Sequence, residues 1–253
     1  QVCYLTSAAP VVTSAKVGPR RKFPLDAVPS DARVVAKLDG SEKLALNADV
    51  EPLMERTTGV YMPYRTRGKY ALRTVEDEVM GRCCELELAE PNVNLPVVVS
   101  EYAVAEFEKP IPIEGCPKSI GMMVKGNSGW GQVYWVVEDK NGMRRISSGG
   151  YGADADCFDH PGTVSVTFTG WNFLQMPLCE ESRINGREYG ANLQWACGKR
   201  GPDGKFTVSG GGPAYPIKLV GVAFAAQNRP LFLTERRPHR QIVRFKDVTV
   251  FDR

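Results

Sequence analysis

The chain has 253 residues, of which 43% are hydrophobic, so it can bury a sizeable core. Its 32 basic and 29 acidic residues leave a formal charge of +3, and the basic residues are scattered along the sequence. That balance is too mild to favour a nucleic-acid partner, and no apolar run approaches the roughly 20 residues of a membrane-spanning helix. The length fits two small domains or one large β domain.

The first 30 residues hold four prolines and show no sustained hydrophobic period. We therefore expect residues 1–30 to form an extension or linker, and residues 31–253 to form the folded domain. Because the sequence begins with Gln1, we also expect a mature or excised product of a larger protein.

Apolar runs with a period of two, separated by turn residues, predict strands along most of the remaining chain. The clearest alternation lies in residues 163–169, where Val164, Val166 and Phe168 are expected to point inward. Pro110, Pro112 and Pro117 predict an edge or a loop, and residues 179–213 predict a long irregular segment. The predicted strands cover residues 33–38, 72–75, 83–88, 97–107, 119–124, 132–138, 143–147, 163–169, 171–178, 217–226 and 241–251.

Residues 119–147 predict the centre of an antiparallel sheet. Within residues 132–138, Val133, Trp135 and Val137 fall on one face, which indicates a half-buried strand. Gln132, Tyr134 and Glu138 fall on the other face, where a site on a concave sheet could use Tyr134. Asn141-Gly142 suits a hairpin turn that requires positive φ.

These strands, with almost no helical periodicity, predict an all-β fold, an antiparallel β-sandwich or jelly roll. The seven cysteines show no Cys-x-x-Cys pair and only two histidines accompany them, so the sequence does not favour a zinc site. We expect buried free thiols with at most one bridge, and Cys179 and Cys197, which flank a long loop, are the first pair to test for it.

Four short segments follow one another in a suggestive order: Leu38-Asp39-Gly40, the hairpin of residues 121–142, Gly170-Trp171-Asn172-Phe173, and the strands that include Tyr215-Pro216 and Phe245-Lys246-Asp247. This order resembles the galactose-binding-like jelly-roll carbohydrate-binding modules of secreted polysaccharide-degrading enzymes. The resemblance implies a non-catalytic module that binds a polysaccharide or oligosaccharide and targets an attached enzyme to it. It also implies a secreted, extracellular or cell-surface bacterial protein with neighbouring domains.

In many such modules the opening and closing strands share a structural calcium ion, and the matching carboxylates here are Asp39 and Asp247. Calcium takes six to eight oxygen ligands, so two acids alone do not complete a site. Ordinary turn and edge residues therefore remain the alternative reading of this pair.

Sugar binding requires an aromatic ring that stacks on a pyranose, with polar groups beside it on loops over a rigid sheet. Trp130 lies between glycines and Trp195 lies in the long irregular segment, whereas Trp135 and Trp171 are assigned to the core. The predicted carbohydrate-binding residues are Asn127, Trp130, Tyr151, Tyr189, Asn192 and Trp195.

Two other functions stay open. A structural or interaction domain would pack against a neighbouring catalytic domain through an apolar patch. A jelly-roll glycoside hydrolase or lyase would need two carboxylates at a fixed separation. Glu85 and Glu87 share what is expected to be a solvated strand face, and no catalytic residue is assigned, so the sequence predicts no enzyme activity.

Overall fold

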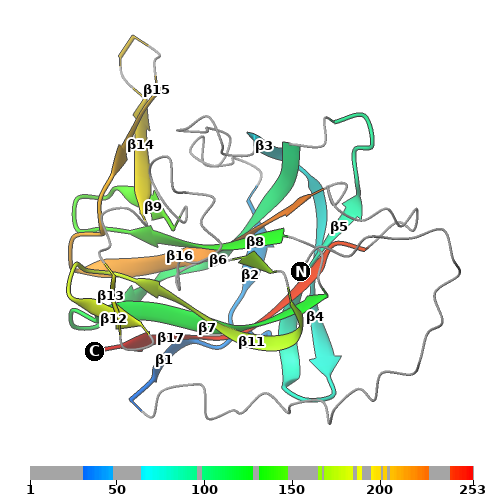
Figure 1. Ribbon diagram of the computed structural model, residues 1–253, viewed down its shortest axis with the longest axis horizontal. Helices are drawn as coiled ribbons and strands as arrows, with labels where there is room; N and C mark the ends of the chain where they lie inside the picture. The colour runs from blue at the N-terminus through cyan, green and yellow to red at the C-terminus, as the bar shows by residue number, and fades with distance from the viewer. Residues whose placement is uncertain are drawn as a thin grey trace, which may run out of the picture.

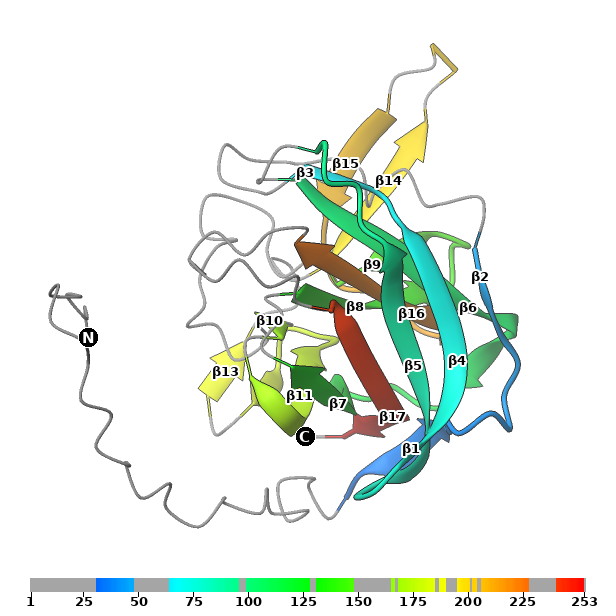
Figure 2. The same cartoon turned by 90° about the vertical axis from the view of Figure 1, so that its right-hand side faces the viewer.

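The computed structural model describes residues 31–47, 64–95, 99–127, 131–147, 165–166, 168–184, 187–189, 195–200, 202–203, 206–227 and 240–252. Within these ranges every regular element is a β-strand (Figures 1 and 2). The described ranges contain no helix long and apolar enough to cross a membrane. The predicted extension over residues 1–30 lies outside them.

Two sheets pack face to face as a β-sandwich, which confirms the predicted fold class (Figure 1). Sheet A has the order β11-β7-β17-β5-β4 with β1 beside β17, and sheet B has the order β15-β14-β9-β8-β16-β6-β2. In sheet B, β10 also pairs with β8, and β3 lies parallel to β6. The strands of sheet A are β1 (Arg33–Ala36), β4 (Lys69–Asp77), β5 (Gly81–Glu90), β7 (Ser119–Asn127), β11 (Thr169–Pro177) and β17 (Ile242–Phe251). The strands of sheet B are β2 (Leu44–Leu46), β3 (Tyr64–Arg67), β6 (Val99–Ile113), β8 (Gly131–Glu138), β9 (Arg144–Ile146), β10 (Ser165–Val166), β14 (Ala196–Arg200), β15 (Phe206–Gly210) and β16 (Ile217–Gln227). A separate hairpin joins β12 (Ser182–Ile184) to β13 (Arg187–Tyr189).

One hydrophobic core lies between the sheets. Phe224 of sheet B meets Tyr70 of sheet A edge to face, with 6.2 Å between the ring centroids, so both rings point inward. Trp135 is fully buried in this core, as predicted. Trp171 instead belongs to a small second cluster with Cys83 and Met123, and it is 8% exposed.

The predicted central hairpin is correct for β8 and β9 and wrong for β7. Asp139 Oδ1 accepts hydrogen bonds from the backbone of Asn141 and Met143, and Gly142 has a φ of +69°, as the turn prediction requires. However, β7 pairs with β11 and β17 in sheet A, so the chain changes sheets between β7 and β8. Residues 119–147 therefore connect the two layers and do not form the centre of one sheet.

Two further expectations need correction. β6 continues through Pro110 and Pro112 to Ile113, where among the described strands it pairs with β16 alone, so these prolines sit at an edge as expected but inside a strand. The segment 179–213, expected to be irregular, contains the four short strands β12 to β15. These strands are only three to five residues long, and β12, β13 and β14 also lack the apolar alternation that reveals a strand. Cys179 is a free thiol, so the candidate disulfide between Cys179 and Cys197 is not formed.

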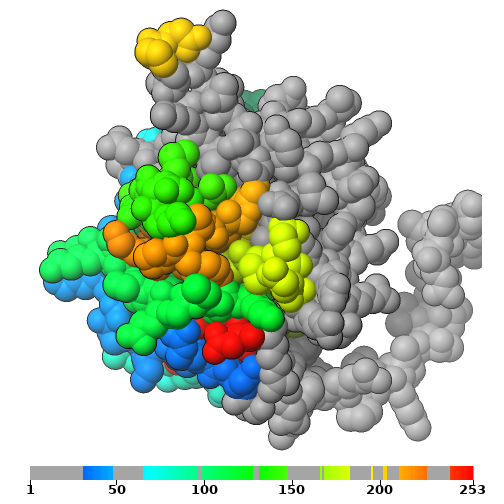
Figure 3. All heavy atoms as spheres, turned by 90° about the vertical axis from the view of Figure 1, so that its left-hand side faces the viewer, coloured from blue at the N-terminus to red at the C-terminus, as the bar shows by residue number. Residues whose placement is uncertain are grey.

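The first and last described strands close the sandwich together. Arg33 of β1 pairs with Val250 of β17, and the two strands run antiparallel. Figure 3 shows these blue and red segments side by side at the lower edge of the molecule. Pairing between strands so distant in sequence makes sheet A depend on both ends of the domain.

Candidate functional site

Most of the predicted loop residues cannot be placed. Trp130, Tyr151 and Asn192 lie outside the described residues, and Tyr189 is described only as part of the backbone of β13. Asn127 ends β7, and its Nδ2 donates a 2.6 Å hydrogen bond to the carbonyl oxygen of Arg240. This bond ties the end of β7 to the segment that enters β17.

Trp195 does not form a surface platform for a sugar. Its side chain is fully buried in the core, and its indole Nε1 donates a 2.5 Å hydrogen bond to the carbonyl oxygen of Pro177. The residue directly precedes β14, which joins sheet B beside β9, so the ring is drawn into the core. The prediction of Trp195 as a stacking residue is therefore wrong.

The outer face of sheet B carries a group of polar and aromatic residues, although its tyrosines are as buried as Trp195. Because Phe224 points into the core, its neighbours Ala223 and Ala225 on β16 point outward. The register places Tyr134 opposite Ala223, and Gln132 opposite Ala225. On the other side of β16, Tyr102 of β6 is opposite Ala225. Small side chains on the central strand are thus flanked by tyrosines and an amide. We call this set, together with Arg65, the β16 trough.

Arg65 reaches into the trough from β3. It pairs in register with Ser100 of β6, two positions before Tyr102 and on the same outward face. Its guanidinium carbon lies 5.0 Å from the centroid of the Tyr134 ring, although β6 and β16 separate β3 from β8. The small side chains of Ala223 and Ala225 leave room for this crossing, which places a cation over an aromatic face.

The polar groups of the trough contact one another. The hydroxyl of Tyr134 donates a hydrogen bond to Oε1 of Gln132. Burial raises the pKa of Tyr134, against an opposing effect of the charge and hydrogen bond of Arg65. Tyr102 and Tyr134 are 0% exposed and Arg65 is 7% exposed, whereas Gln132 is half-buried. The trough therefore offers a cation, a phenol and an amide in a mostly dry setting.

The outer face of sheet A carries an ionic network. Glu85 accepts a 2.8 Å hydrogen bond from Arg244, and Glu87 is paired with both Arg73 and Arg240. Both glutamates are nearly buried, so the expectation of a solvated strand face is wrong. Burial opposes ionisation of Glu87, but Arg240 and Arg73 outweigh it and hold its pKa below the usual range. A glycosidase acid needs a raised pKa, so this arrangement does not supply one from Glu87.

Asp77 anchors the same face from the tip of the curved β4–β5 hairpin (Figure 2). Its fully buried carboxylate accepts hydrogen bonds from Lys125 at 2.6 Å, Arg244 at 2.8 Å and the indole nitrogen of Trp171 at 2.9 Å. Two more bonds come from the backbone of Val79 and Met80. The network thus holds the hairpin tip against β7 and β11, a structural task that the sequence pattern did not reveal.

Asp39 and Asp247 lie close enough for their charges to interact, beside the pairing of β1 with β17. Asp247 sits at an irregularity of β17 with a φ of +44°, and its Oδ1 is buried without a hydrogen-bond partner. Burial raises the pKa of Asp247, against an opposing effect of Lys246, and the nearby charge of Asp39 raises it further. Oδ1 of Asp39 accepts bonds from the backbone and hydroxyl of Ser41.

This pair fits part of a cation site. An orphaned carboxylate oxygen beside a second acid suits a hard cation such as calcium, which prefers oxygen ligands. No cluster of three or more His, Cys, Asp or Glu side chains in the described ranges could hold a metal. Backbone carbonyls and water would have to complete the coordination.

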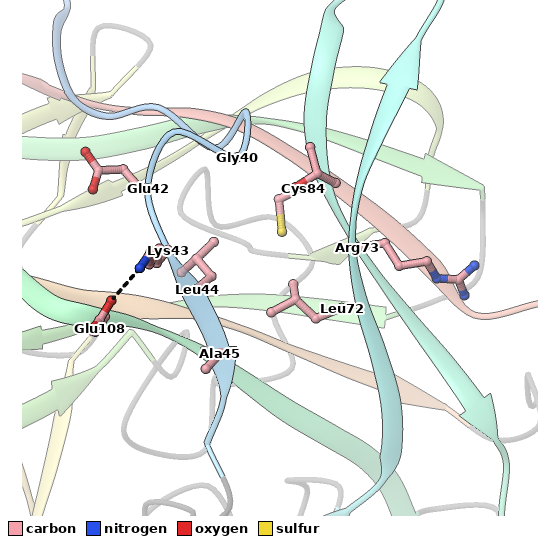
Figure 4. A pocket seen from close by; sticks show the side chains of 10 residues that line it. Gly40, Glu42, Lys43, Leu44, Ala45, Leu72, Arg73, Cys84 and Glu108 are labelled. Carbon is pink, nitrogen blue, oxygen red and sulfur yellow. Dashed lines mark ion pairs between the residues drawn. The ribbon is translucent and has the colours of Figure 1, made fainter.

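A separate groove opens between the edges of the two sheets (Figure 4). It has a volume of about 520 Å³ and lies between β2 and β4. Leu44, Leu72 and Cys84 point toward one another across it, and the ion pair of Lys43 with Glu108 lies on its rim. Its lining mixes aliphatic residues with the charged side chains of Glu42, Lys43, Arg73 and Glu108, and none of the lining residues is an aromatic ring for a sugar.

The sequence matches no protein-family model and no curated protein. Among solved structures the chain is similar to the module CtCBM11, at 8% identity over 90% of this chain and 98% of that one, with a TM-score of 0.41. It is also similar to the family 11 carbohydrate-binding module of the cellulosomal cellulase Lic26A-Cel5E of Clostridium thermocellum, at 7% identity over 88% and 95% of the two chains, with a TM-score of 0.39. A third likeness is to the family 30 carbohydrate-binding module of the cellulosomal cellulase Cel9D-Cel44B of the same organism, at 12% identity over 88% and 94% of the chains, with a TM-score of 0.32.

Proposed function

We propose that this chain is a carbohydrate-binding module whose β16 trough holds the sugar without covalent chemistry. The observation that carries the proposal is the meeting of Tyr134, Gln132 and Arg65 over the small residues of β16. Amide and guanidinium groups hydrogen-bond sugar hydroxyls, and phenol rings offer apolar contact. A rigid sheet positions all three.

Binding at the trough includes the cost of exposing it, because Tyr102 and Tyr134 are closed to solvent. The apparent affinity is then the intrinsic affinity multiplied by the fraction of molecules in which the trough is open. We therefore expect moderate affinity and slow association.

The test is a screen of residues 1–253 by affinity gel electrophoresis against plant, algal and host polysaccharides. We expect retardation on one polymer class, and a loss of affinity of about tenfold in Gln132→Ala because one amide hydrogen-bond set is removed. Gln175→Ala is the matched control, since Gln175 is a half-buried amide on the outer face of sheet A. Equal losses in the two variants, or no retardation on any polymer, would contradict the proposal.

Two finer points belong to the same proposal. Trp130 stacks on the sugar from the loop between β7 and β8, and Trp130→Ala tests this independently of the trough. The module is secreted, carries calcium at Asp39 and Asp247, and directs an attached enzyme to its polymer. Finding the chain fused to a polysaccharide-degrading domain in an extracellular fraction would support this arrangement, and purification as a free intracellular chain would contradict it.

A second candidate, docking on a neighbouring domain, is favoured by the groove between β2 and β4. Both strands present an edge that has no partner strand within the described ranges. The large hydrophobic residues exposed within those ranges, Val34, Leu46, Val79 and Val93, lie on different segments and form no single patch. If the chain binds none of the glycans tested and Leu44→Glu weakens its association with a neighbouring domain, docking is favoured over sugar binding.

A further inference from the structure

Arg65 is a buried cation with no carboxylate partner among the described residues. Its Nε is closed to solvent and makes no hydrogen bond, and its guanidinium contacts Tyr134. Two half-buried arginines of the described residues are neutralised: Arg145 pairs with Asp139 at 2.9 Å, and Arg244 pairs with Asp77 and Glu85 at 2.8 Å. Burying a charge without an opposite partner costs free energy of folding, so we looked for a functional role of Arg65.

Glu101 does not supply the missing negative charge. The register places it on β6 next to β3, opposite Thr66. Successive side chains of a strand alternate, so Glu101 faces away from the side that carries Tyr102 and Arg65. Its Oε2 accepts a 2.8 Å bond from the backbone of Asn92, and burial raises its pKa. It is thus engaged on the other side of the sheet.

The acids on the outer face of sheet B that the hydrogen bonds describe are engaged with other residues. Glu106 accepts a 2.9 Å bond from Arg144 and a 2.7 Å bond from Asn47, and Glu138 pairs with Lys218 at 2.9 Å. Arg65 is therefore the buried cation on this face whose charge no described acid compensates, whereas Arg67, in register with Tyr102, is exposed to solvent.

We propose that the β16 trough selects an anionic glycan, in which a carboxylate or sulfate group of the sugar pairs with Arg65. This inference rests on the proposed carbohydrate-binding function and names the class of sugar. A guanidinium presents a planar fork of donors that matches a carboxylate or a sulfate, and the contact strengthens in a dry site. The Gln132 amide and the Tyr134 hydroxyl lie beside it to bind neighbouring sugar hydroxyls.

The test compares each charged polymer with its neutral counterpart. Polygalacturonate is paired with carboxyl-reduced polygalacturonate, and carrageenan with desulfated carrageenan, so the two arms separate a carboxylate from a sulfate. We expect the charged member of one pair to bind at least about tenfold more tightly, because a charge-assisted hydrogen-bond pair is lost in the other.

Three variants assign that preference to Arg65. Arg65→Gln should erase it, Arg65→Lys should keep part of it, and Arg73→Gln should leave it unchanged because Arg73 lies on sheet A and pairs with Glu87. Near-ultraviolet circular dichroism checks that each variant is folded. The comparison of charged with neutral polymers on the parent chain does not depend on any variant.

The outcomes separate this inference from the function beneath it. If a neutral polymer binds as tightly as its charged form, the module stands and its anionic selectivity is refuted. A preference that survives in Arg65→Gln refutes the assignment of Arg65. If neither member of either pair binds and the affinity-gel screen detects no other polysaccharide, the proposed function itself is refuted.

Discussion

Arg65 is a residue whose removal should stabilise the protein. Desolvating an ion costs several kcal/mol, whereas a buried cation–π contact returns about 2 kcal/mol. We expect Arg65→Met to raise the free energy of unfolding by roughly 1–3 kcal/mol in the absence of ligand. Urea titration followed by tryptophan fluorescence measures the change.

Arg145→Met is the matched control, because it leaves the buried carboxylate of Asp139 without its ion partner. It should destabilise the protein by about 3–5 kcal/mol. If Arg65→Met is as destabilising as Arg145→Met, Arg65 is a structural residue and the trough has no unmet charge.

Asp77 should make stability fall in acid. Burial opposes its charged form, but the hydrogen bonds from Lys125, Trp171, Val79 and Arg244 hold its pKa well below the usual range. This contribution is present above the unfolded pKa of about 4 and is lost as pH falls toward the folded pKa. Asp77→Asn should cost about 3–5 kcal/mol at pH 7 and flatten the dependence between pH 5 and pH 3. Urea midpoints across that range provide the measurement, and an unchanged slope would contradict the assignment.

The sequence predicted some residue roles and missed others for a physical reason. Alternation along β8 correctly separated Tyr134 from Trp135, because a strand has a period of two. Trp195 was misplaced because neither its burial nor its bond to Pro177 leaves a local pattern. Arg65 could not be found, since two strands separate it from its partner Tyr134, which comes about 70 residues later.

At the scale of the strand, Gly221 marks the point where β16 is irregular. The register shifts between Leu219 and Gly221 relative to both neighbouring strands. A Cβ at Gly221 would lie 2.2 Å from the carbonyl oxygen of Ala105, which is backbone and cannot rotate away. Gly221→Ala should therefore cost about 3 kcal/mol or more in thermal and urea unfolding. Gly142→Ala, which meets no neighbour but has a φ of +69°, should cost only roughly 1–2 kcal/mol. If Gly221→Ala and Gly142→Ala lower the free energy of unfolding equally, the backbones of β16 and β6 do not approach as closely at Gly221 as the structure indicates.

The irregularity at Asp247 should make stability depend on calcium. An acid with a raised folded pKa contributes stability below its unfolded pKa, and that contribution is lost as pH rises through the folded value. A bound cation would compensate for this carboxylate at neutral pH. We expect the melting temperature to rise in a few millimolar calcium and to fall again with EDTA.

Asp247→Asn keeps a residue type that tolerates positive φ and removes the charge. It should be at least as stable as the parent without calcium and lose the response to calcium. A parent whose melting temperature ignores calcium would refute the metal assignment.

The elements most visible in the sequence were those that bury one apolar face. β16 and β17 were predicted within one residue at each end because their runs are long and apolar. The exchange of sheets between β7 and β8 was not predictable, since pairing partners depend on contacts distant in sequence. β12 to β15 were missed because strands of three to five residues carry little periodic signal.

For the whole molecule, the shared core predicts that the two sheets unfold as one unit. The same hydrophobic cluster contains Cys84 of sheet A and Trp135 of sheet B. Burial raises the pKa of Cys84 to about 12, so its thiol should resist alkylation until the core opens. Alkylation of Cys84, read by peptide mass spectrometry, should follow the same urea curve as tryptophan fluorescence.

Cys116 is exposed and should label at every urea concentration, which controls for the reagent. Labelling of Cys84 at lower urea than the fluorescence change would mean that sheet A opens first. The trough on sheet B would then rest on a layer that stays folded alone, and glycan binding would persist after Cys84 becomes reactive.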